Sequence, residues 1–256
     1  MEENPDRNLK DKYTAAEKKI SAIVLAAGSG RRMHSGEKKQ FMDLCGMPVV
    51  VHSLLAFEKN KNIDSVVVVT AKEDVHRMLM LSLRYNLRKV KNIAEGGDMR
   101  FKSVYSGLKA VDADTDYILV HDGARPLVSQ ELIDRCCEYV SIYKACVAAV
   151  PVTDTIKIAD DRMFIKETVD RSRLWAVQTP QAFSYSIFMR AYDRLYNTIR
   201  EYNSDPSKIT DDAMIVENMG DTPVHFVPGE YSNIKITTPE DMLIARAFIE
   251  GKDKNK

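Results

Sequence analysis

The chain has 256 residues, and its 37 basic and 37 acidic side chains leave no net charge. This balance argues against nucleic acid or an anionic membrane as a partner, because any site for an anion has to be local. No apolar run approaches the roughly 20 residues that span a bilayer. The N-terminus lacks the apolar core of a secretory signal and is too acidic for an organelle transit peptide, so we expect a cytoplasmic protein.

Composition and length are those of an ordinary globular protein. We expect a single domain over residues 19–250, preceded by a flexible N-terminal extension, 1–18, and followed by a C-terminal tail, 251–256. The four cysteines contain no C-x-x-C pair. This spacing predicts reduced, buried thiols and not a zinc site.

Short β-branched runs alternate with amphipathic segments in the first part of the chain. The predicted strands are 20–26, 65–70, 91–96, 117–122 and 146–152. The predicted helices are 49–60, 73–84, 101–111 and 129–143, the last with Ser129 as its N-cap. Strands that are apolar almost throughout and alternate with helices predict an α/β, Rossmann-like fold, in which a mostly parallel sheet has helices on both faces.

The pattern changes after Pro151. Two short alternating segments, 154–159 and 163–169, are joined by the turn-like DDR and predict a β-hairpin. We therefore expect residues 152–177 to project as a β-arm. Exposed isoleucine and phenylalanine on such an arm usually pack on another surface, and the natural candidate is the partner subunit of a homodimer. The remaining expected elements are a helix near 185–200, a strand near 223–227 and a helix over 239–251.

The first predicted strand runs directly into AAGSG, at the strand end where parallel sheets bind ligands. Gly28 and Gly30 lack a Cβ, so the backbone can turn tightly and its N–H groups can converge on an anion. The Walker A pattern is absent, and Met33 stands at the third glycine position of the dinucleotide fingerprint. The cations that follow are Arg31, Arg32, Lys38 and Lys39. They suit a polyphosphate, although a solvated charged surface is the ordinary alternative.

The segment AAGSGRRM, followed by KKQF, resembles the cytidylyltransferase signature L-A-A-G-x-G-x-R-M with a downstream P-K-Q. Lys38 stands where proline is common, an exchange that we expect to loosen the loop while leaving Lys39 in place. Further matches follow in chain order: EGGDMRFKSV (95–104), VHDGARP (120–126), PVTDTIK (151–157), TVDRSRLW (168–175), QTPQ (178–181), TDDA (210–213) and NIKIT (233–237).

Together these motifs cover residues 20–250 and resemble the 2-C-methyl-D-erythritol 4-phosphate cytidylyltransferase family of the non-mevalonate isoprenoid pathway. The resemblance implies a fold of the nucleotide-diphospho-sugar transferase type. It also implies that the substrate phosphate attacks the α-phosphorus of CTP in line with the departing pyrophosphate. Two alternatives stay open: a ribitol 5-phosphate cytidylyltransferase, which the segment TVDRSRLW disfavours, and a non-catalytic nucleotide-binding regulator.

The resemblance also implies a catalytic set, which is Arg32, Lys39, Arg171 and Lys235. Asp122 would hold Mg²⁺ or another divalent cation against the triphosphate. These residue types suit the reaction, because an ionised phosphate nucleophile needs positioning and positive charge more than a base. Ordinary alternatives remain, since a strand-end aspartate such as Asp122 often forms a turn. Lys235, treated as part of a strand, could simply face solvent.

By the same resemblance, two further sets bind the ligands. The nucleotide-binding set is Ala26, Ala27, Gly28, Ser29, Gly30, Gly97, Arg100 and Ser103. The substrate-binding set is Arg125, Thr155, Thr210 and Asp211. Ser103 could equally be an ordinary residue of a helix first turn. Because Arg171 and Thr155 fall on the arm, they would complete the site of the partner subunit. His121 is expected to face the other side of its strand and to be structural.

Overall fold

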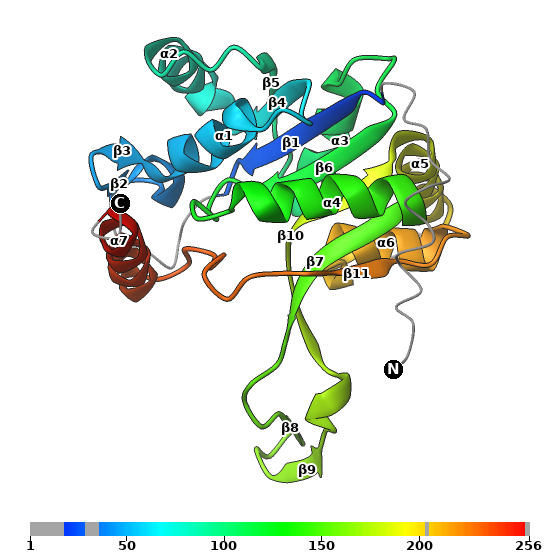
Figure 1. The fold of residues 1–256 in the computed structure, drawn as a ribbon. Helices are drawn as coiled ribbons and strands as arrows, with labels where there is room; N and C mark the ends of the chain where they lie inside the picture. Colours follow the sequence, from blue (N-terminus) through cyan, green and yellow to red (C-terminus); the bar gives the residue numbers. More distant parts are fainter. Residues whose placement is uncertain (1–17, 29–35, 203–204, 254–256) are drawn as a thin grey trace, which may run out of the picture.

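The computed structural model describes residues 18–28, 36–202 and 205–253. Its centre is a seven-stranded sheet with the order β11-β7-β10-β6-β1-β4-β5 (Figure 1). Four neighbouring strands are parallel: β6 (Tyr117–Asp122), β1 (Ile20–Ala26), β4 (Ser65–Thr70) and β5 (Val90–Glu95). Their carboxyl ends therefore lie at one edge of the sheet, which is the edge where the sequence predicts a ligand.

An antiparallel strand interrupts this parallel arrangement. β10 (Trp175–Ser184) lies between β6 and β7 (Ala145–Pro151) and runs antiparallel to both. β11 (His225–Pro228) is parallel to β7. The sheet is thus mostly parallel, as predicted. β10 is not among the predicted strands because its middle reads QTPQ, and polar residues with a proline are unusual in a buried strand.

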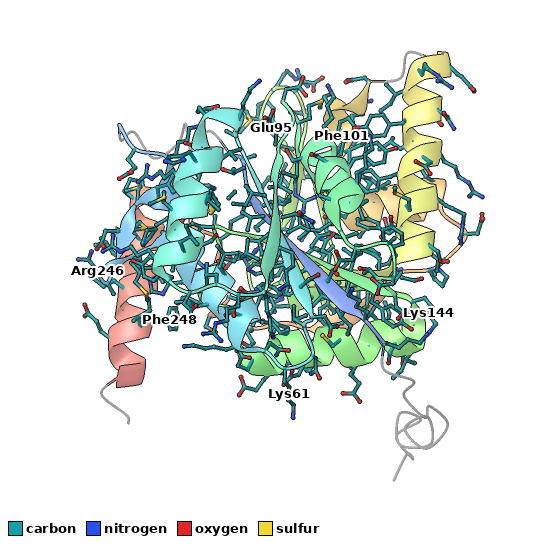
Figure 2. The ribbon with its side chains drawn as sticks, turned by 90° about the horizontal axis from the view of Figure 1, so that it is seen from above. Lys61, Glu95, Phe101, Lys144, Arg246 and Phe248 are labelled. Atoms are coloured by element: carbon teal, nitrogen blue, oxygen red, sulfur yellow. The ribbon has the colours of Figure 1, made fainter. Side chains whose placement is uncertain are left out.

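Helices cover both faces of the sheet, as predicted, and their side chains fill the space between the layers (Figure 2). On one face lie α1 (Val49–Lys59), α2 (Val75–Arg84) and α4 (Gln130–Tyr143). The core on this face includes Ala22, Val24, Val50, Leu54, Met78 and Leu132.

The opposite face carries α3 (Arg100–Ala110), α5 (Tyr185–Tyr202) and α6 (Asp212–Met219). Its core includes Ile23, Val104, Leu108, Phe188, Tyr192 and Ile215. Successive residues of β1 enter the two cores alternately because side chains of a strand point to opposite faces. This explains why the central strands are apolar at consecutive positions.

The remaining elements pack beside the first helix. A short hairpin of β2 (Asp43–Leu44) and β3 (Met47–Pro48) shares a small core with α7 (Pro239–Asp253). The single-turn helices η4 (Lys39–Phe41) and η5 (Lys72–Asp74) lie near this end of the fold. In the described part of the chain, no helix is both long and apolar enough to cross a membrane.

The strands and helices predicted up to residue 152 are all present, with ends shifted by at most two residues. The Ser129 cap is confirmed, since its Oγ accepts a hydrogen bond from the Leu132 N–H at 3.0 Å. The helix α6 is not among the predicted elements. It has eight residues, and its acidic start gives little apolar periodicity.

The predicted β-arm is present and projects from the sheet (Figure 1). The chain leaves at Pro151 and returns at Trp175, and these two residues are paired across β7 and β10. Between them, β8 (Lys157–Ala159) and β9 (Ile165–Thr168) form the antiparallel hairpin, and η6 (Arg171–Arg173) follows it. Trp175, at the base of the arm, is 38% exposed and stacks on Phe226.

Three of the four cysteines are buried, as predicted, but the prediction for Cys45 is wrong. Cys45 is exposed, with a backbone φ of 51° in the tight turn between β2 and β3. Such turns lie at the surface, so a thiol there is not part of the core.

Lys38 connects the segment after the glycine loop to η5. Its Nζ lies 2.5 Å from Glu73 Oε1 and 2.6 Å from Asp74 Oδ2. Its backbone φ of −65° is the value to which proline is restricted. Lys38 thus keeps a conformation that suits proline and adds two ion pairs, which does not fit the loosening expected from the sequence.

His121 lies next to the end of β6 and is completely buried. Its Nδ1 is 3.1 Å from Thr179 Oγ1, and its Nε2 is 3.1 Å from the carbonyl oxygen of Arg125. Burial lowers the pKa of His121 to about 4, against smaller raising effects of that carbonyl group and of Asp122. The positive charges of Arg125 and Lys235 act in the lowering direction too. His121 is therefore neutral at pH 7, which agrees with a structural role.

The two ion pairs of Lys38 predict different effects for two substitutions. Lys38→Ala should lower the free energy of unfolding by about 0.5–1 kcal/mol because it removes partly buried ion pairs. Lys38→Pro should stay within about 0.5 kcal/mol of the wild type, since proline restricts the unfolded chain. Urea unfolding of the three proteins measures this. A proline variant that is less stable than the alanine variant would contradict it.

The low pKa of His121 predicts an acid sensitivity of the fold. An unfolded chain binds a proton at histidine below a pKa of about 6.5, whereas the native His121 binds it only near pH 4. The free energy of unfolding should therefore fall by up to about 3 kcal/mol as the pH drops from 6.5 to 4. Urea unfolding of His121→Gln at pH 7 and pH 4.5 should show a smaller loss than the wild type. Equal losses of unfolding free energy in both proteins would refute the low pKa of His121.

Candidate active site

A cavity of about 570 Å³ opens at the carboxyl ends of β1, β5 and β6. The loops that follow these three strands supply most of its lining. The predicted residues that line it are Ala26, Ala27, Gly28, Lys39, Gly97, Arg100, Ser103, Asp122 and Lys235. The structure therefore brings together at one site residues that the sequence analysis assigned to the nucleotide, to catalysis and to a metal ion.

A second cavity, of about 320 Å³, adjoins the first. Its lining includes three of the four predicted substrate residues, Arg125, Thr210 and Asp211. Arg100, Asp122 and Lys235 line both cavities. These three charged side chains thus mark the place where the two cavities meet.

The loops after β1 and β5 approach each other closely. A Cβ on Gly96 would lie 2.5 Å from the Cβ of Ala27, so only glycine fits at that point. The Ser103 Oγ accepts a hydrogen bond from the Gly97 N–H at 3.1 Å and donates one to the Met99 carbonyl oxygen at 3.2 Å. Ser103 therefore stabilises the first turn of α3, which is the structural role that the sequence also allowed. It lines the cavity as well.

Lys39 is placed at the cavity by η4. Its Nζ donates a hydrogen bond to the carbonyl oxygen of Ile236 at 3.0 Å. The next residue, Gln40, is buried, and its Nε2 donates to the carbonyl oxygen of Ala26 at 2.8 Å. This contact fixes η4 against the end of β1. The other predicted residues of this loop, Ser29, Gly30 and Arg32, lie outside the described residues.

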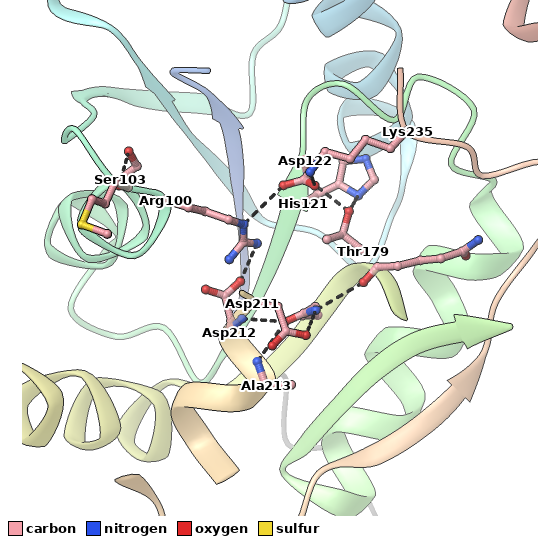
Figure 3. A network of polar contacts seen from close by, with 12 residues as sticks. Arg100, Ser103, His121, Asp122, Thr179, Asp211, Asp212, Ala213 and Lys235 are labelled. Carbon is pink, nitrogen blue, oxygen red and sulfur yellow. Dashed lines mark hydrogen bonds and ion pairs between the residues drawn. The ribbon is translucent and has the colours of Figure 1, made fainter. Parts of the chain in front are cut away.

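Asp122 is the centre of a chain of charges at the junction of the two cavities (Figure 3). Its Oδ2 lies 2.6 Å from Lys235 Nζ, and its Oδ1 lies 3.7 Å from Arg100 Nε. Burial alone would raise the pKa of Asp122, but Arg100 and Lys235 together lower it well below the usual range. The carboxylate is therefore ionised at any physiological pH. Its backbone N–H donates to Thr179 Oγ1 at 3.1 Å, which joins the site to β10.

Lys235 reaches this chain from an irregular segment. Residues 233–237 form no strand, which corrects the expectation from the sequence. The segment is held by Asn233, whose side-chain nitrogen donates to the Thr179 carbonyl oxygen at 2.8 Å. The Lys235 side chain is 38% exposed, but its ion pair with the buried carboxylate of Asp122 gives it a specific partner at the site, which a merely solvent-facing lysine would lack.

Arg100 has a second partner that the sequence analysis missed. Its Nη2 lies 2.7 Å from the Oδ2 of Asp212, which is completely buried at the start of α6. Burial alone would lower the pKa of Arg100, but the charges of Asp212 and Asp122 raise it. The motif TDDA contains Asp212, but a sequence motif does not show which of its two aspartates, Asp211 or Asp212, is buried in the core.

Asp211 and Arg125 each make contacts within the protein at the second cavity. Asp211 caps α6, since its Oδ1 accepts from the Met214 N–H at 3.0 Å, and its Oδ2 accepts from Gln181 Nε2 at 3.0 Å. Arg125 Nη1 donates to the carbonyl oxygen of Asn233 at 2.6 Å. Both side chains are thus held in place before any ligand binds.

Arg171 and Thr155 are not part of either cavity of the same chain. They lie on the projecting arm (Figure 1), where Arg171 Nη1 donates to the Thr153 carbonyl oxygen at 2.6 Å. Both residues are exposed. Their distance from the cavities follows from the length of the arm.

The junction of the two cavities offers a divalent cation a single carboxylate ligand among the described residues. Asp122 offers one ionised carboxylate at the edge of the first cavity, and Mg²⁺ is often held by one or two carboxylates with phosphate oxygens as its other ligands. The described ranges contain no group of three or more histidine, cysteine, aspartate or glutamate side chains that could hold a metal. A cation at Asp122 would therefore depend on ligands from a bound phosphate compound.

Comparison with known proteins gives a consistent result. A sequence model of the family described as "IspD: 2-C-methyl-D-erythritol 4-phosphate cytidylyltransferase" matches residues 20–251. A 2-C-methyl-D-erythritol 4-phosphate cytidylyltransferase of Lachnospira eligens is 47% identical over 231 residues, which are 90% of this chain and 99% of the relative. That of Clostridioides difficile is 42% identical over 238 residues, which are 92% and 96% of the two chains.

A solved structure also resembles this chain over most of its length. It is the 4-diphosphocytidyl-2C-methyl-D-erythritol synthase from Anaerococcus prevotii, with a TM-score of 0.77 and 34% identity. The match covers 91% of this chain and 99% of that chain. On the family match and these identities, the chain belongs to the 2-C-methyl-D-erythritol 4-phosphate cytidylyltransferase family.

Proposed function

We propose that this chain joins CTP and 2-C-methyl-D-erythritol 4-phosphate to give 4-diphosphocytidyl-2-C-methyl-D-erythritol and pyrophosphate. The observation that carries the proposal is the meeting of two cavities at Arg100, Asp122 and Lys235, in a chain of this family. Two anionic ligands in adjoining cavities would place their phosphates at the shared cations. The named relatives favour this substrate over ribitol 5-phosphate.

The reaction needs positioning and charge stabilisation more than a base. The attacking phosphate oxygen is already ionised at neutral pH, so the barrier lies in bringing two polyanions together. His121 is neutral and buried, and both of its ring nitrogens are engaged in hydrogen bonds, so it is not a base in this scheme. Lys39, Lys235 and Arg32 would stabilise the charge on the pentacoordinate phosphorus and on the leaving pyrophosphate.

The ligand-binding roles follow the two cavities. The loop over residues 26–30 would cradle the triphosphate with its N–H groups, and Gly97 and Ser103 would border the cytosine and ribose. Arg125, Thr210 and Asp211 would hold the second substrate in the smaller cavity. A divalent cation at Asp122, when bound, would neutralise part of the charge of the triphosphate. In this proposal, residues 19–250 act as one catalytic domain, with 1–18 and 251–256 as extensions.

We also propose a cytoplasmic homodimer in which the arm of each chain completes the site of its partner. The support is the exposed apolar tip of the arm, where Met163, Phe164 and Ile165 are 85%, 66% and 68% exposed. A surface of this kind is usually covered in a stable protein. Arg171 and Thr155, which lie outside the cavities of their own chain, would then reach those of the partner.

The proposed reaction predicts pyrophosphate release from CTP that depends on the acceptor. We expect release in the presence of Mg²⁺ with methylerythritol 4-phosphate, and none with ribitol 5-phosphate or without an acceptor. Lys39→Ala should lower kcat by about 100–1,000-fold, as for the loss of a group that stabilises transition-state charge. The matched control is Lys61→Ala, because Lys61 is exposed and lines neither cavity. Release with ribitol 5-phosphate alone would overturn the substrate, and CTP binding without release would favour a regulator.

The shared site predicts complementation between two inactive variants. Lys39→Ala changes a residue that lines the larger cavity, and Arg171→Ala changes a residue of the arm. In a heterodimer of the two chains, one site has both substitutions and the other has neither. Because random association makes about half of the dimers mixed, co-refolded equal amounts should recover about one quarter of the wild-type activity. Activity no higher than the sum of the separate variants would contradict the exchange of arms.

A further inference from the structure

Asp212 is a completely buried carboxylate with two side-chain partners. Its Oδ1 accepts a hydrogen bond from the Tyr192 hydroxyl at 2.9 Å. Its Oδ2 lies 2.7 Å from Arg100 Nη2 (Figure 3). The backbone N–H of Asp212 donates to Gln181 Oε1 at 3.1 Å. A buried carboxylate is costly unless it is paired, so these contacts tie Asp212 and Arg100 to each other.

The two ends of the Arg100 guanidinium are held with unequal firmness. The Nη2 contact to Asp212 is short, whereas Nε is 3.7 Å from Asp122, beyond hydrogen-bond distance. The arginine side chain remains 27% exposed, and it lines both cavities. A phosphate group that arrives at the junction can therefore replace the loose contact with Asp122, while the contact with Asp212 keeps the guanidinium in place.

We infer that Asp212 is a positioning residue, which holds Arg100 at the junction of the cavities so that the guanidinium binds the phosphates that react there. This inference rests on the proposed function and deepens it. Within the nucleotide-binding set, it assigns Arg100 to the reacting phosphates. Arginine suits that place because its planar fork can bind two phosphate oxygens at once.

The arrangement of helices explains why this aspartate can act as an anchor. Arg100 is the first residue of α3, and Asp212 is the first residue of α6, while Tyr192 comes from the middle of α5. All three helices pack on the same face of the sheet. The anchor is therefore part of the core and lies outside the loops, so it can fix the arginine before the ligands bind and reduce the cost of orienting them.

A double-mutant cycle tests whether Asp212 acts through Arg100. We expect Asp212→Asn to lower kcat by about 10–100-fold, the effect of a misplaced catalytic group, with a smaller change in KM for CTP. If Arg100→Gln has already removed the positioned group, adding Asp212→Asn should lower kcat by no more than about twofold. Losses that multiply in the double variant would overturn the inference.

Two further variants separate positioning from stability. Asp221→Asn removes an exposed aspartate that pairs with Arg194, and it should leave kcat unchanged. Tyr192→Phe keeps the Asp212 carboxylate and removes one hydrogen bond, so it should fold if Asp212→Asn does not. We expect it to lower kcat several-fold at a temperature where urea unfolding shows it fully native. A fully native Tyr192→Phe with wild-type kcat and KM would refute the positioning role.

A failure of the proposed function can be told apart from a failure of this inference. If the wild type releases no pyrophosphate with any acceptor, the function fails, and calorimetric binding of inorganic pyrophosphate then decides the inference. Asp212→Asn and Arg100→Gln should each weaken that binding by at least about tenfold, and together by little more than either alone. Unchanged binding in Asp212→Asn would overturn the inference whatever the reaction.

Discussion

The ionised carboxylate of Asp122 is the interaction on which the site depends. It stands at the end of the central strand β6 and is paired with Lys235 and Arg100, which come from two other parts of the chain. Without these cations, burial of the carboxylate would be costly. The start of α3 and the segment 233–237 thus each supply a cation at the same sheet edge, and the two cavities meet at this point.

The alternation of a β-strand gives two neighbouring residues opposite roles. His121 and Asp122 are consecutive in β6, so their side chains point to opposite faces. Burial next to Phe57 leaves the imidazole neutral, whereas the cations beside Asp122 keep its carboxylate charged. His121 therefore belongs to the core beneath the strand end, whereas Asp122 lines the two cavities.

The charges at the junction lie at different depths. Asp212 is inside the core, Asp122 is at the edge of the cavities, and Arg100 and Lys235 pair with these carboxylates and line both cavities. Such a layered order suits a reaction in which two polyanions must meet, because the protein has already oriented its cations. The arm differs, since its apolar side chains, such as Met163 and Phe164, are exposed.

The sequence by itself determined the parallel strands, the helices between them, the Ser129 cap and the β-arm, because strand and helix periods are local properties. Its motifs also named most of the residues around both cavities. Only the tertiary structure decided that β10 lies antiparallel between β6 and β7, and that Cys45 faces solvent. It also decided that Arg100 meets the buried Asp212. Strand order and ion pairs between distant segments depend on how whole elements pack, and no local pattern of residues encodes that.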